Sequence, residues 1–188
     1  MKAPEAKAIV IGASAGALEA LSAILPALPE DFTPPIMIVV HVPQHRDSAL
    51  AELFQARCRL RVKEAEDKEP IVPGTIYFAP SDYHLLVEEG HSLALSSDEP
   101  VLFSRPAIDV LFESAAEAYG AGLVGVVLTG ANGDGARGLK AIVDAGGRAL
   151  VQSPRGAFAA TMPEAAIEAV PGAMVIALER IAACLQEI

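Results

Sequence analysis

Short apolar runs alternate with segments of helical length along most of this chain of 188 residues. The runs from Ala8 to Ile11 and from Ile36 to Val40 carry apolar side chains on both faces, which is typical of strands covered on both sides. The first run precedes an alanine-rich segment, from about Ala15 to Ala27, with apolar residues at helical spacing. Because parallel strands need a crossover that is usually a helix, this order predicts a parallel sheet.

The middle of the chain has a different pattern. Four short β-rich runs follow one another there with turn residues between them, and Glu89-Gly90 between the last two predicts a hairpin. We expect these runs to form an antiparallel excursion at one edge of the sheet. The four runs extend from Arg61 to Ala65, from Thr75 to Phe78, from Leu85 to Val87 and from Ser92 to Leu95.

Alternating helices and strands resume after Pro106. The predicted fold class is therefore α/β: a doubly wound, mostly parallel sheet in a Rossmann-like three-layer arrangement, with a small antiparallel excursion at one edge. The length fits one globular domain over residues 1–188. The remaining expected elements are a helix to about Tyr119, a buried strand from Leu123 to Leu128, a helix from Ala136 to Ala145, a strand from Arg148 to Gln152, and helices near Pro163 to Ala169 and Leu178 to Glu187.

Composition argues against several classes of protein. The net charge of −10 and the pI of about 4.8 disfavour a nucleic-acid-binding protein, since phosphate binding needs clustered Lys and Arg. The two cysteines, Cys58 and Cys184, form no C-x-x-C pair, which disfavours a structural zinc site or a disulfide framework and favours a reduced, cytoplasmic compartment. No apolar run approaches the roughly 18 residues of a membrane span.

A candidate nucleophile follows the first strand. Gly12-Ala13-Ser14-Ala15-Gly16 has the G-x-S-x-G pattern in the strand-turn-helix setting that exposes a reactive serine. The helix N-terminus behind Ser14 offers unpaired N–H groups to a developing oxyanion. The alternative is that Ser14 only caps the helix, and the pentapeptide by itself does not decide between the two roles.

A serine hydroxyl needs an adjacent base to act as a nucleophile. His41 ends the second apolar strand. Because the carboxyl ends of parallel strands meet at one edge, where open α/β sheets bind ligands, we expect His41 to lie near Ser14 as its base. The alternative is a loop histidine that bonds only to backbone groups.

The third member of a triad should bind the other nitrogen of the imidazole. Asp134 follows the third buried strand, in a glycine-rich loop that leaves the same edge. Asp82 lies in the antiparallel excursion, and Asp109 and Asp144 lie in helical segments. Asp134 is thus the predicted acid, with a helix N-cap as its alternative role. The order Ser, His, Asp differs from the Ser, Asp, His order of α/β-hydrolases, so we do not expect that superfamily.

The other histidines give weaker signals. His45 lies four residues after His41, but Pro43 between them breaks any helix and no H-E-x-x-H pattern is present, so no metal site is expected. His84 starts a strand, where we expect packing or surface exposure. His91 lies in the hairpin turn, where we expect solvent around it.

Taken together, these residues make the chain resemble the catalytic domain of the chemotaxis protein-glutamate methylesterases, the CheB type. The resemblance extends over nearly the whole length, in several independent segments that occur in the right order. The family's catalytic serine, histidine and aspartate fall on Ser14, His41 and Asp134. The matching segments are Ile9 to Gly16, Val40 to Gln44, Ile76 to Pro80, Tyr83 to Leu85, Ser104 to Pro106, Asp109 to Phe112, Val127 to Gly130, Gly133 to Leu139 and Met162 to Ile167.

The resemblance implies hydrolysis of γ-glutamyl methyl esters on the cytoplasmic helices of chemoreceptors, with release of methanol, and also deamidation of glutamine at such sites. Ser14 would attack the carbonyl, His41 would act as base and then as acid, and Asp134 would fix the His41 tautomer. The backbone N–H groups of Ala15 and Ala131 are the candidate oxyanion donors. No metal, organic cofactor or membrane insertion is implied, and the oligomeric state stays open.

Three features depart from the usual family pattern. Typical members carry an N-terminal phospho-receiver domain, whereas the first strand here begins around Ala8, so we expect a single methylesterase catalytic domain without one. Such a chain is either a stand-alone enzyme or an excised domain. The nucleophile turn has Ala15 and Ala17 where threonine and a second glycine are common. The loop before the acid reads Gly130-Ala131-Asn132 where many members have Gly-Met-Gly. The last two changes bear on the oxyanion geometry and the substrate preference.

Two alternative functions remain at this point. A catalytically silent partner-binding domain could keep the same fold, and turnover of a methylated receptor fragment would distinguish it from an enzyme. A nucleotide-binding module is disfavoured, because Gly12 to Gly16 lacks the G-x-G-x-x-G pattern and His41 stands where an acidic ribose ligand is expected.

Overall fold

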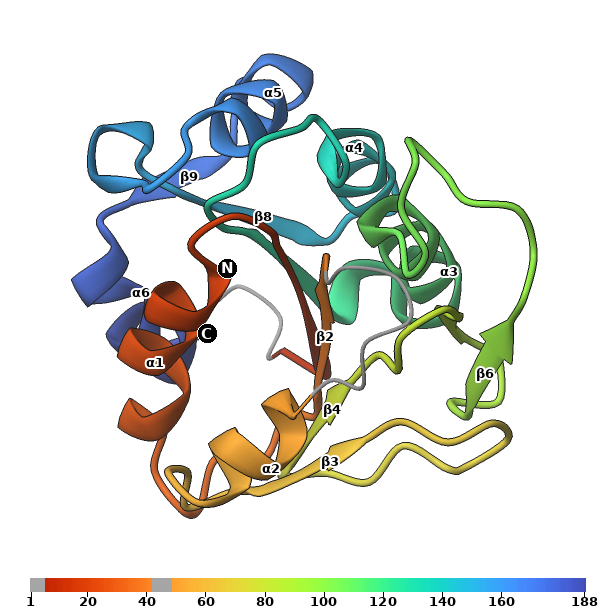
Figure 1. Cartoon of the computed structure of the whole chain (residues 1–188). Helices are drawn as coiled ribbons and strands as arrows, with labels where there is room; N and C mark the ends of the chain where they lie inside the picture. Colours follow the sequence, from red (N-terminus) through yellow and green to blue (C-terminus); the bar gives the residue numbers. More distant parts are fainter. Residues whose placement is uncertain (1–5, 42–48) are drawn as a thin grey trace.

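The computed structural model describes residues 6–41 and 49–188, and a sheet of seven strands forms its centre (Figure 1). The strands are β1 (Ala8–Ala13), β2 (Ile36–Val40), β3 (Arg61–Glu64), β4 (Thr75–Phe78), β7 (Leu123–Val127), β8 (Arg148–Gln152) and β9 (Met174–Ile176). They lie in the order β3-β4-β2-β1-β7-β8-β9, and neighbouring strands pair in parallel. The predicted α/β fold class is confirmed.

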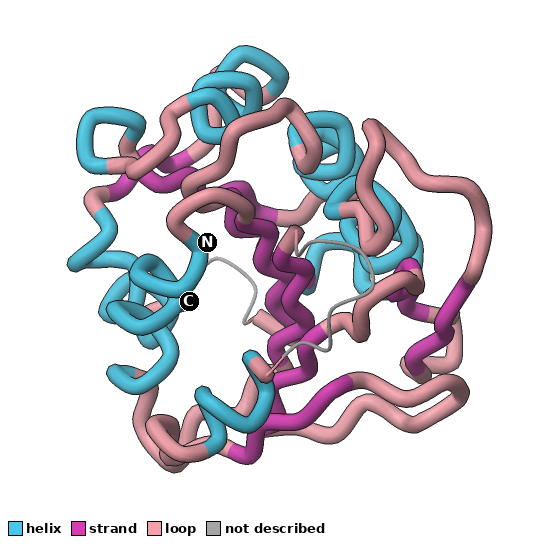
Figure 2. Tube along the Cα trace, viewed as in Figure 1, coloured by secondary structure: helices cyan, strands magenta, loops and turns pink. Residues whose placement is uncertain are grey.

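Helices cover both faces of this sheet, which gives the molecule three layers (Figure 2). The helices are α1 (Ala17–Ile24), α2 (Leu50–Gln55), α3 (Ile108–Tyr119), α4 (Ala136–Asp144), α5 (Thr161–Ala169) and α6 (Leu178–Gln186). Because successive strand side chains point to opposite faces, two cores form. Leu21 and Phe54 bring α1 and α2 onto one core with α6, and Phe112 and Leu139 bring α3 and α4 onto the other with α5.

The chain winds outward from β1 in two directions. β2 pairs with one side of β1, and β7 pairs with the other side. The helix after β1 packs on one face of the sheet, and the helix after β7 packs on the opposite face. The carboxyl ends of two such strands form the crevice in which open α/β sheets bind ligands. Ser14 and Asp134 follow β1 and β7, so the topology brings both residues to this crevice.

One part of the expected antiparallel excursion is wrong. β3 and β4 belong to the main sheet, where Val62 pairs in parallel with Ile76. Residues 65–74 form the crossover between these strands without a helix, and this absence of helical sequence is what suggested an antiparallel order. The hairpin prediction is confirmed. β5 (His84–Val87) and β6 (Leu93–Ser96) pair antiparallel as a separate two-stranded sheet.

A proline after α1 and the short length of β9 explain the remaining differences from the expected elements. The first helix is α-helical only to Ile24, because Pro26 lacks an N–H donor, and Leu25–Ala27 continues as a 3-10 turn. β9 has three residues at the edge of the sheet, too few for a recognisable pattern. Among the helices of residues 6–41 and 49–188, none has the length and apolar character to cross a membrane.

Candidate active site

The candidate nucleophile lies in the tight turn between β1 and α1. β1 ends at Ala13, and the Ser14 N–H donates to the carbonyl of Thr129 at 2.9 Å, which continues the ladder with the chain after β7. Gly16 has a φ of 84°, a left-handed conformation that glycine adopts without steric cost. The G-x-S-x-G segment therefore forms a strand-turn-helix, with Ser14 partly exposed at the edge of the sheet.

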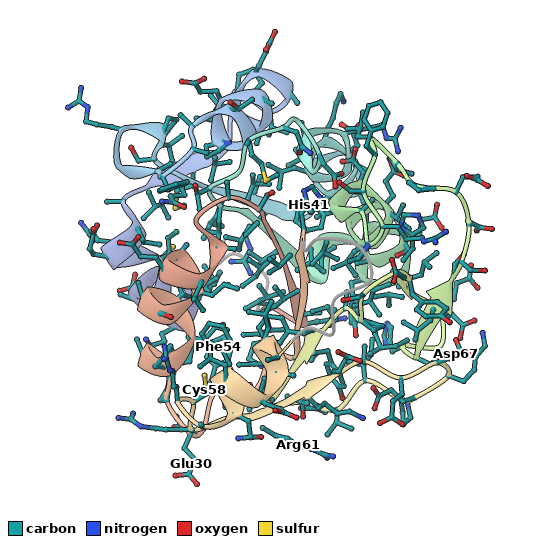
Figure 3. All side chains as sticks on the ribbon, in the orientation of Figure 1. Glu30, His41, Phe54, Cys58, Arg61 and Asp67 are labelled. Carbon is teal, nitrogen blue, oxygen red and sulfur yellow. The ribbon has the colours of Figure 1, made fainter. Side chains whose placement is uncertain are left out.

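His41 follows β2 at the position that matches Ser14 in β1 (Figure 3). The strand register pairs Ala13 with Val40, so the residues that follow them lie side by side at the spacing of neighbouring strands, about 4.8 Å. Val39, two residues before His41, packs in the core beneath α3, α4 and α5. Because side chains alternate along a strand, His41 points to this same face.

The His41 ring and the Asp134 carboxylate form a hydrogen bond of 2.7 Å between Nε2 and Oδ2. The Asp134 side chain is 0% exposed and that of His41 is 11% exposed. A carboxylate can only accept, so Nε2 donates the proton and Nδ1 of the neutral ring keeps the lone pair that a general base needs. His41 and Asp134, which the strand order predicts at the same edge of the sheet, therefore make direct contact.

Asp134 also caps a helix, but not the helix that begins beside it. Its Oδ2 accepts the N–H of Ile108 at 2.7 Å and its Oδ1 accepts the N–H of Asp109 at 2.9 Å, in the first turn of α3. Unpaired N–H groups and the helix dipole stabilise a carboxylate at this position. The two roles considered for Asp134 therefore coincide in one side chain, because the cap on α3 holds the carboxylate toward His41.

Asp109 makes the reciprocal contact from α3 to α4. Its Oδ1 accepts the N–H of Gly135 at 3.0 Å and the N–H of Gly138 at 2.7 Å. Burial raises the pKa of the Asp109 carboxyl above its ordinary value, the Gly138 N–H opposes this shift, and the negative charge of Asp134 adds to it. The start of α3 is thus capped by Asp134, from the loop before α4, and the start of α4 is capped by Asp109, from the first turn of α3.

Asp109 is not a site residue predicted from the sequence, because it lies in a helical segment. The structure places it 2% exposed in the first turn of α3. An acidic residue in a first turn, two residues after an alanine that cannot cap, was the available signal. That signal does not say which neighbouring helix receives the carboxylate, so the contact with α4 was not predictable from it.

Gly138 allows α3 and α4 to approach closely enough for these caps. A Cβ at this position would lie 2.5 Å from the Cβ of Phe112 and 3.1 Å from the Cα of Asp109. Alanine is favoured over glycine in a helix by about 1 kcal/mol. We nevertheless expect Gly138→Ala to lower the free energy of unfolding by about 1–3 kcal/mol, because the backbone of α3 must move.

Urea unfolding measures this effect, with Gly156→Ala as the matched control. A Cβ on Gly156 meets nothing within 4 Å, so this variant should have nearly wild-type stability. A Gly138→Ala protein as stable as the wild type would contradict the close packing of the two helices.

Within the described ranges, the Ser14 hydroxyl and the His41 ring share no hydrogen bond. Catalytic hydrogen bonds are often long without substrate and tighten when it binds. In residues 6–41 and 49–188, no acceptor is found for the N–H groups of Ala15 and Ala131. His41 therefore contacts Asp134 directly, and Ser14 lies at the matching position after the neighbouring strand.

Thr129 ties the nucleophile turn to two other parts of the chain. Its hydroxyl donates to the carbonyl of Ala15 at 2.8 Å and accepts the N–H of Ala159 at 2.9 Å. Its own N–H donates to Oε1 of Gln152, also at 2.9 Å. Thr129 and Gln152 are both buried polar residues. No local sequence pattern marks these two residues, because their role depends on segments that meet only in the folded chain.

His84 and His91 lie away from the candidate site. His84 is buried in β5, and its Nδ1 accepts the N–H of Ala107 at 3.1 Å. His91 is exposed in the hairpin turn and stacks on Tyr119, with ring centroids 4.3 Å apart. His45 lies outside the described residues. In the part of the chain that the structure describes, no three His, Cys, Asp or Glu side chains gather as a metal site would require.

Comparison with known proteins identifies the family. A family profile described as CheB methylesterase matches residues 9–185. The chain belongs to the CheB methylesterase family. The matched range includes β1, β2 and β7 and the segments after them that carry Ser14, His41 and Asp134. The family resemblance inferred from the sequence is confirmed.

Individual members of the methylesterase family support this assignment. A Leptospira interrogans protein named "Putative protein-glutamate methylesterase/protein-glutamine glutaminase" is 50% identical over 176 residues, which cover 94% of this chain and 91% of that protein. The protein-glutamate methylesterase/protein-glutamine glutaminase of Chromohalobacter salexigens is 39% identical and is covered over 54% of its length. The crystal structure of the Thermotoga maritima CheB methylesterase catalytic domain matches with a TM-score of 0.92 and 33% identity, over 98% of this chain and 99% of that one.

Proposed function

We propose that this chain is a protein-glutamate methylesterase that hydrolyses γ-glutamyl methyl esters on the cytoplasmic helices of chemoreceptors, and that it also deamidates glutamine at such positions. The observation that carries the proposal is the 2.7 Å hydrogen bond between His41 and Asp134, at the same edge of the sheet as Ser14. Membership of the methylesterase family and the names of the relatives support the same substrate class.

Ser14, His41 and Asp134 carry out the proposed reaction, with water as the second nucleophile. Ser14 Oγ attacks the ester carbonyl carbon while Nδ1 of His41 takes the hydroxyl proton. The imidazolium returns this proton to the methoxide as the C–O bond breaks, so that methanol leaves and Ser14 is acylated. Water then repeats both steps and releases the glutamate carboxylate. Asp134 keeps the proton on Nε2 and stabilises the imidazolium. In deamidation, ammonia replaces methanol as the leaving group.

The N–H groups of Ala15 and Ala131 are the proposed oxyanion donors. Ala15 precedes Gly16 at the start of α1, and Ala131 lies in the loop after β7. The two loops are joined by the hydrogen bond from the Ser14 N–H to the Thr129 carbonyl. Donors that have no protein partner can bind the negative charge of the tetrahedral intermediate without first breaking another hydrogen bond.

The proposed substrate places the reaction in the cytoplasm, because these receptor helices lie there. The 188 residues act in this proposal as one catalytic domain. The family match over residues 9–185 supports this, as do the two cores on the faces of one main sheet. No metal or organic cofactor takes part in the proposed steps.

Incubation with a methylated fragment of a chemoreceptor's cytoplasmic helices tests the proposal. We expect methanol to be released, and mass spectrometry to show demethylation of glutamate side chains. Failure of the folded protein to turn over this fragment would instead favour a partner-binding domain that keeps the fold without activity. A search for demethylated proteins in cells with and without this chain would then identify the receptor.

A further inference from the structure

Phe158 presents an exposed aromatic ring beside the nucleophile turn. Its side chain is 77% exposed, although burial of such a ring is strongly favourable. A Cβ built on Gly16 would lie 2.6 Å from the Cβ and 3.1 Å from the Cγ of Phe158, so the Phe158 side chain begins directly against the backbone of Gly16. Gly16 is two residues after Ser14, a span of at most about 7 Å. The ring therefore lies at the rim of the candidate active site.

Hydrogen bonds fix the segment that carries this ring. The N–H of Ala159 donates to the Thr129 hydroxyl at 2.9 Å, and the N–H of Gly130 donates to the Ala159 carbonyl at 3.1 Å. The N–H of Met162, in α5, donates to the Gly130 carbonyl at 3.0 Å. Phe158 is thus held by the same loop that contacts Ser14. A side chain on such a fixed segment loses little conformational entropy when it binds a partner.

A hollow of about 220 Å³ adjoins the ring. Ala20 and Leu178 line it together with Phe158, between α1 and the segment 154–160. This volume is smaller than the roughly 300 Å³ of the smallest common ligand pockets, and it suits one side chain rather than a whole small molecule. Polar residues, among them Thr129 and Gln152, also line the hollow, and Gly16 connects it to the nucleophile turn. The ring of Phe158 therefore offers exposed apolar surface at the edge of a partly polar hollow.

The proposed substrate is a helix, and helix geometry determines which of its residues can contact Phe158. A helix rises 5.4 Å per turn, so a helix whose ester lies at Ser14 can place residues one or two turns away over Gly16 and Phe158. We infer that Phe158 is a substrate-docking residue, which binds an apolar side chain three to seven residues from the esterified glutamate. This inference rests on the proposed function, from which it takes the helical substrate. Phe158 in this role favours esters on proteins over small esters.

Phe158→Ala in the full chain tests the inference with two substrates, a methylated chemoreceptor fragment and N-acetylglutamate γ-methyl ester. Alanine keeps the Cβ that lies against Gly16, so the nucleophile turn is retained. We expect KM for the fragment to rise about tenfold or more while kcat stays within about twofold. The value of kcat/KM for the small ester should not change. Phe158→Leu should recover most of the lost affinity, because it restores apolar surface.

Met174→Ala is the matched control, since it removes a side chain that is 53% exposed at the start of β9. Equal KM values for the fragment in Phe158→Ala and Met174→Ala would overturn the docking role and leave the proposed function intact. A parallel loss on the small ester would also overturn it, because the ring would then act by supporting the nucleophile turn. A wild-type protein that releases no methanol from the fragment would reject the proposed function, and the docking role with it.

Discussion

Replacement of Ser14 by alanine is expected to lower kcat for a methylated receptor fragment by on the order of 10⁴-fold or more. The hydroxyl supplies the oxygen that becomes acylated, and the members of a triad act as a unit, so loss of one removes most of the rate. The fold should be unchanged, because the hydrogen bonds of Ser14 come from its backbone. Its N–H donates to Thr129 and its carbonyl accepts from Ala17, and alanine keeps both.

Ser22→Ala is the matched control for this change. Ser22 lies on α1, and its hydroxyl accepts one long hydrogen bond, 3.5 Å, from Arg57 at the surface. Both variants should unfold within a few degrees of the wild-type Tm, and only Ser14→Ala should lose methanol release. A fluorophosphonate label found on the peptide that contains Ser14 gives a second measurement. A Ser14→Ala protein that retains more than a tenth of the wild-type rate would exclude Ser14 as the nucleophile.

Strands and helices were predictable where a short, continuous stretch of the sequence determines them. β2 and β8 have the bounds read from their apolar runs, because a buried parallel strand needs a continuous apolar stretch and polar or turn residues at its ends. The pairing of β3 and β4 was not predictable in this way. The runs are short and no helical sequence separates them, and the choice of sheet partner depends on strands that are distant in the sequence.

The candidate site was predictable to the extent that topology determines it. His41 and Asp134 were expected at one edge because parallel strands share their direction, and their side chains lie 2.7 Å apart. The choice of Nε2 for this contact depends on where α3 holds the carboxylate, and no local pattern contains that information. Asp109 and Phe158 were missed for the same reason. The burial of Asp109 and the exposure of Phe158 depend on which segments pack above them.

Asp134→Asn is expected to lower kcat by about 10⁴-fold and also to destabilise the fold by about 1–3 kcal/mol. Both carboxylate oxygens of Asp134 accept hydrogen bonds: Oδ2 from the His41 ring and Ile108, and Oδ1 from the Asp109 N–H. Asparagine has one oxygen and one NH₂ group. In either orientation of the amide, its NH₂ faces an N–H donor, so at least one buried donor loses its acceptor.

The loss of activity follows from the same geometry. If the NH₂ group of asparagine faces His41, the ring must turn its proton to Nδ1, and the nitrogen that should act as base toward Ser14 becomes a donor. If the oxygen faces His41, the imidazolium formed during attack lacks its counter-charge, and the first turn of α3 is left with an unsatisfied N–H group. Both orientations therefore impair the base, and both leave a buried donor without a partner.

Asp144→Asn is the matched control, because this carboxylate is exposed on α4 and pairs only with Lys140 among the residues that the structure describes. An exposed pair of this kind contributes less than about 1 kcal/mol, so stability and kcat should stay near the wild-type values. Thermal unfolding together with methanol release separates the two variants. An Asp134→Asn protein with normal stability and a kcat within tenfold of the wild type would show that neither the cap on α3 nor the orientation of His41 depends on this carboxylate.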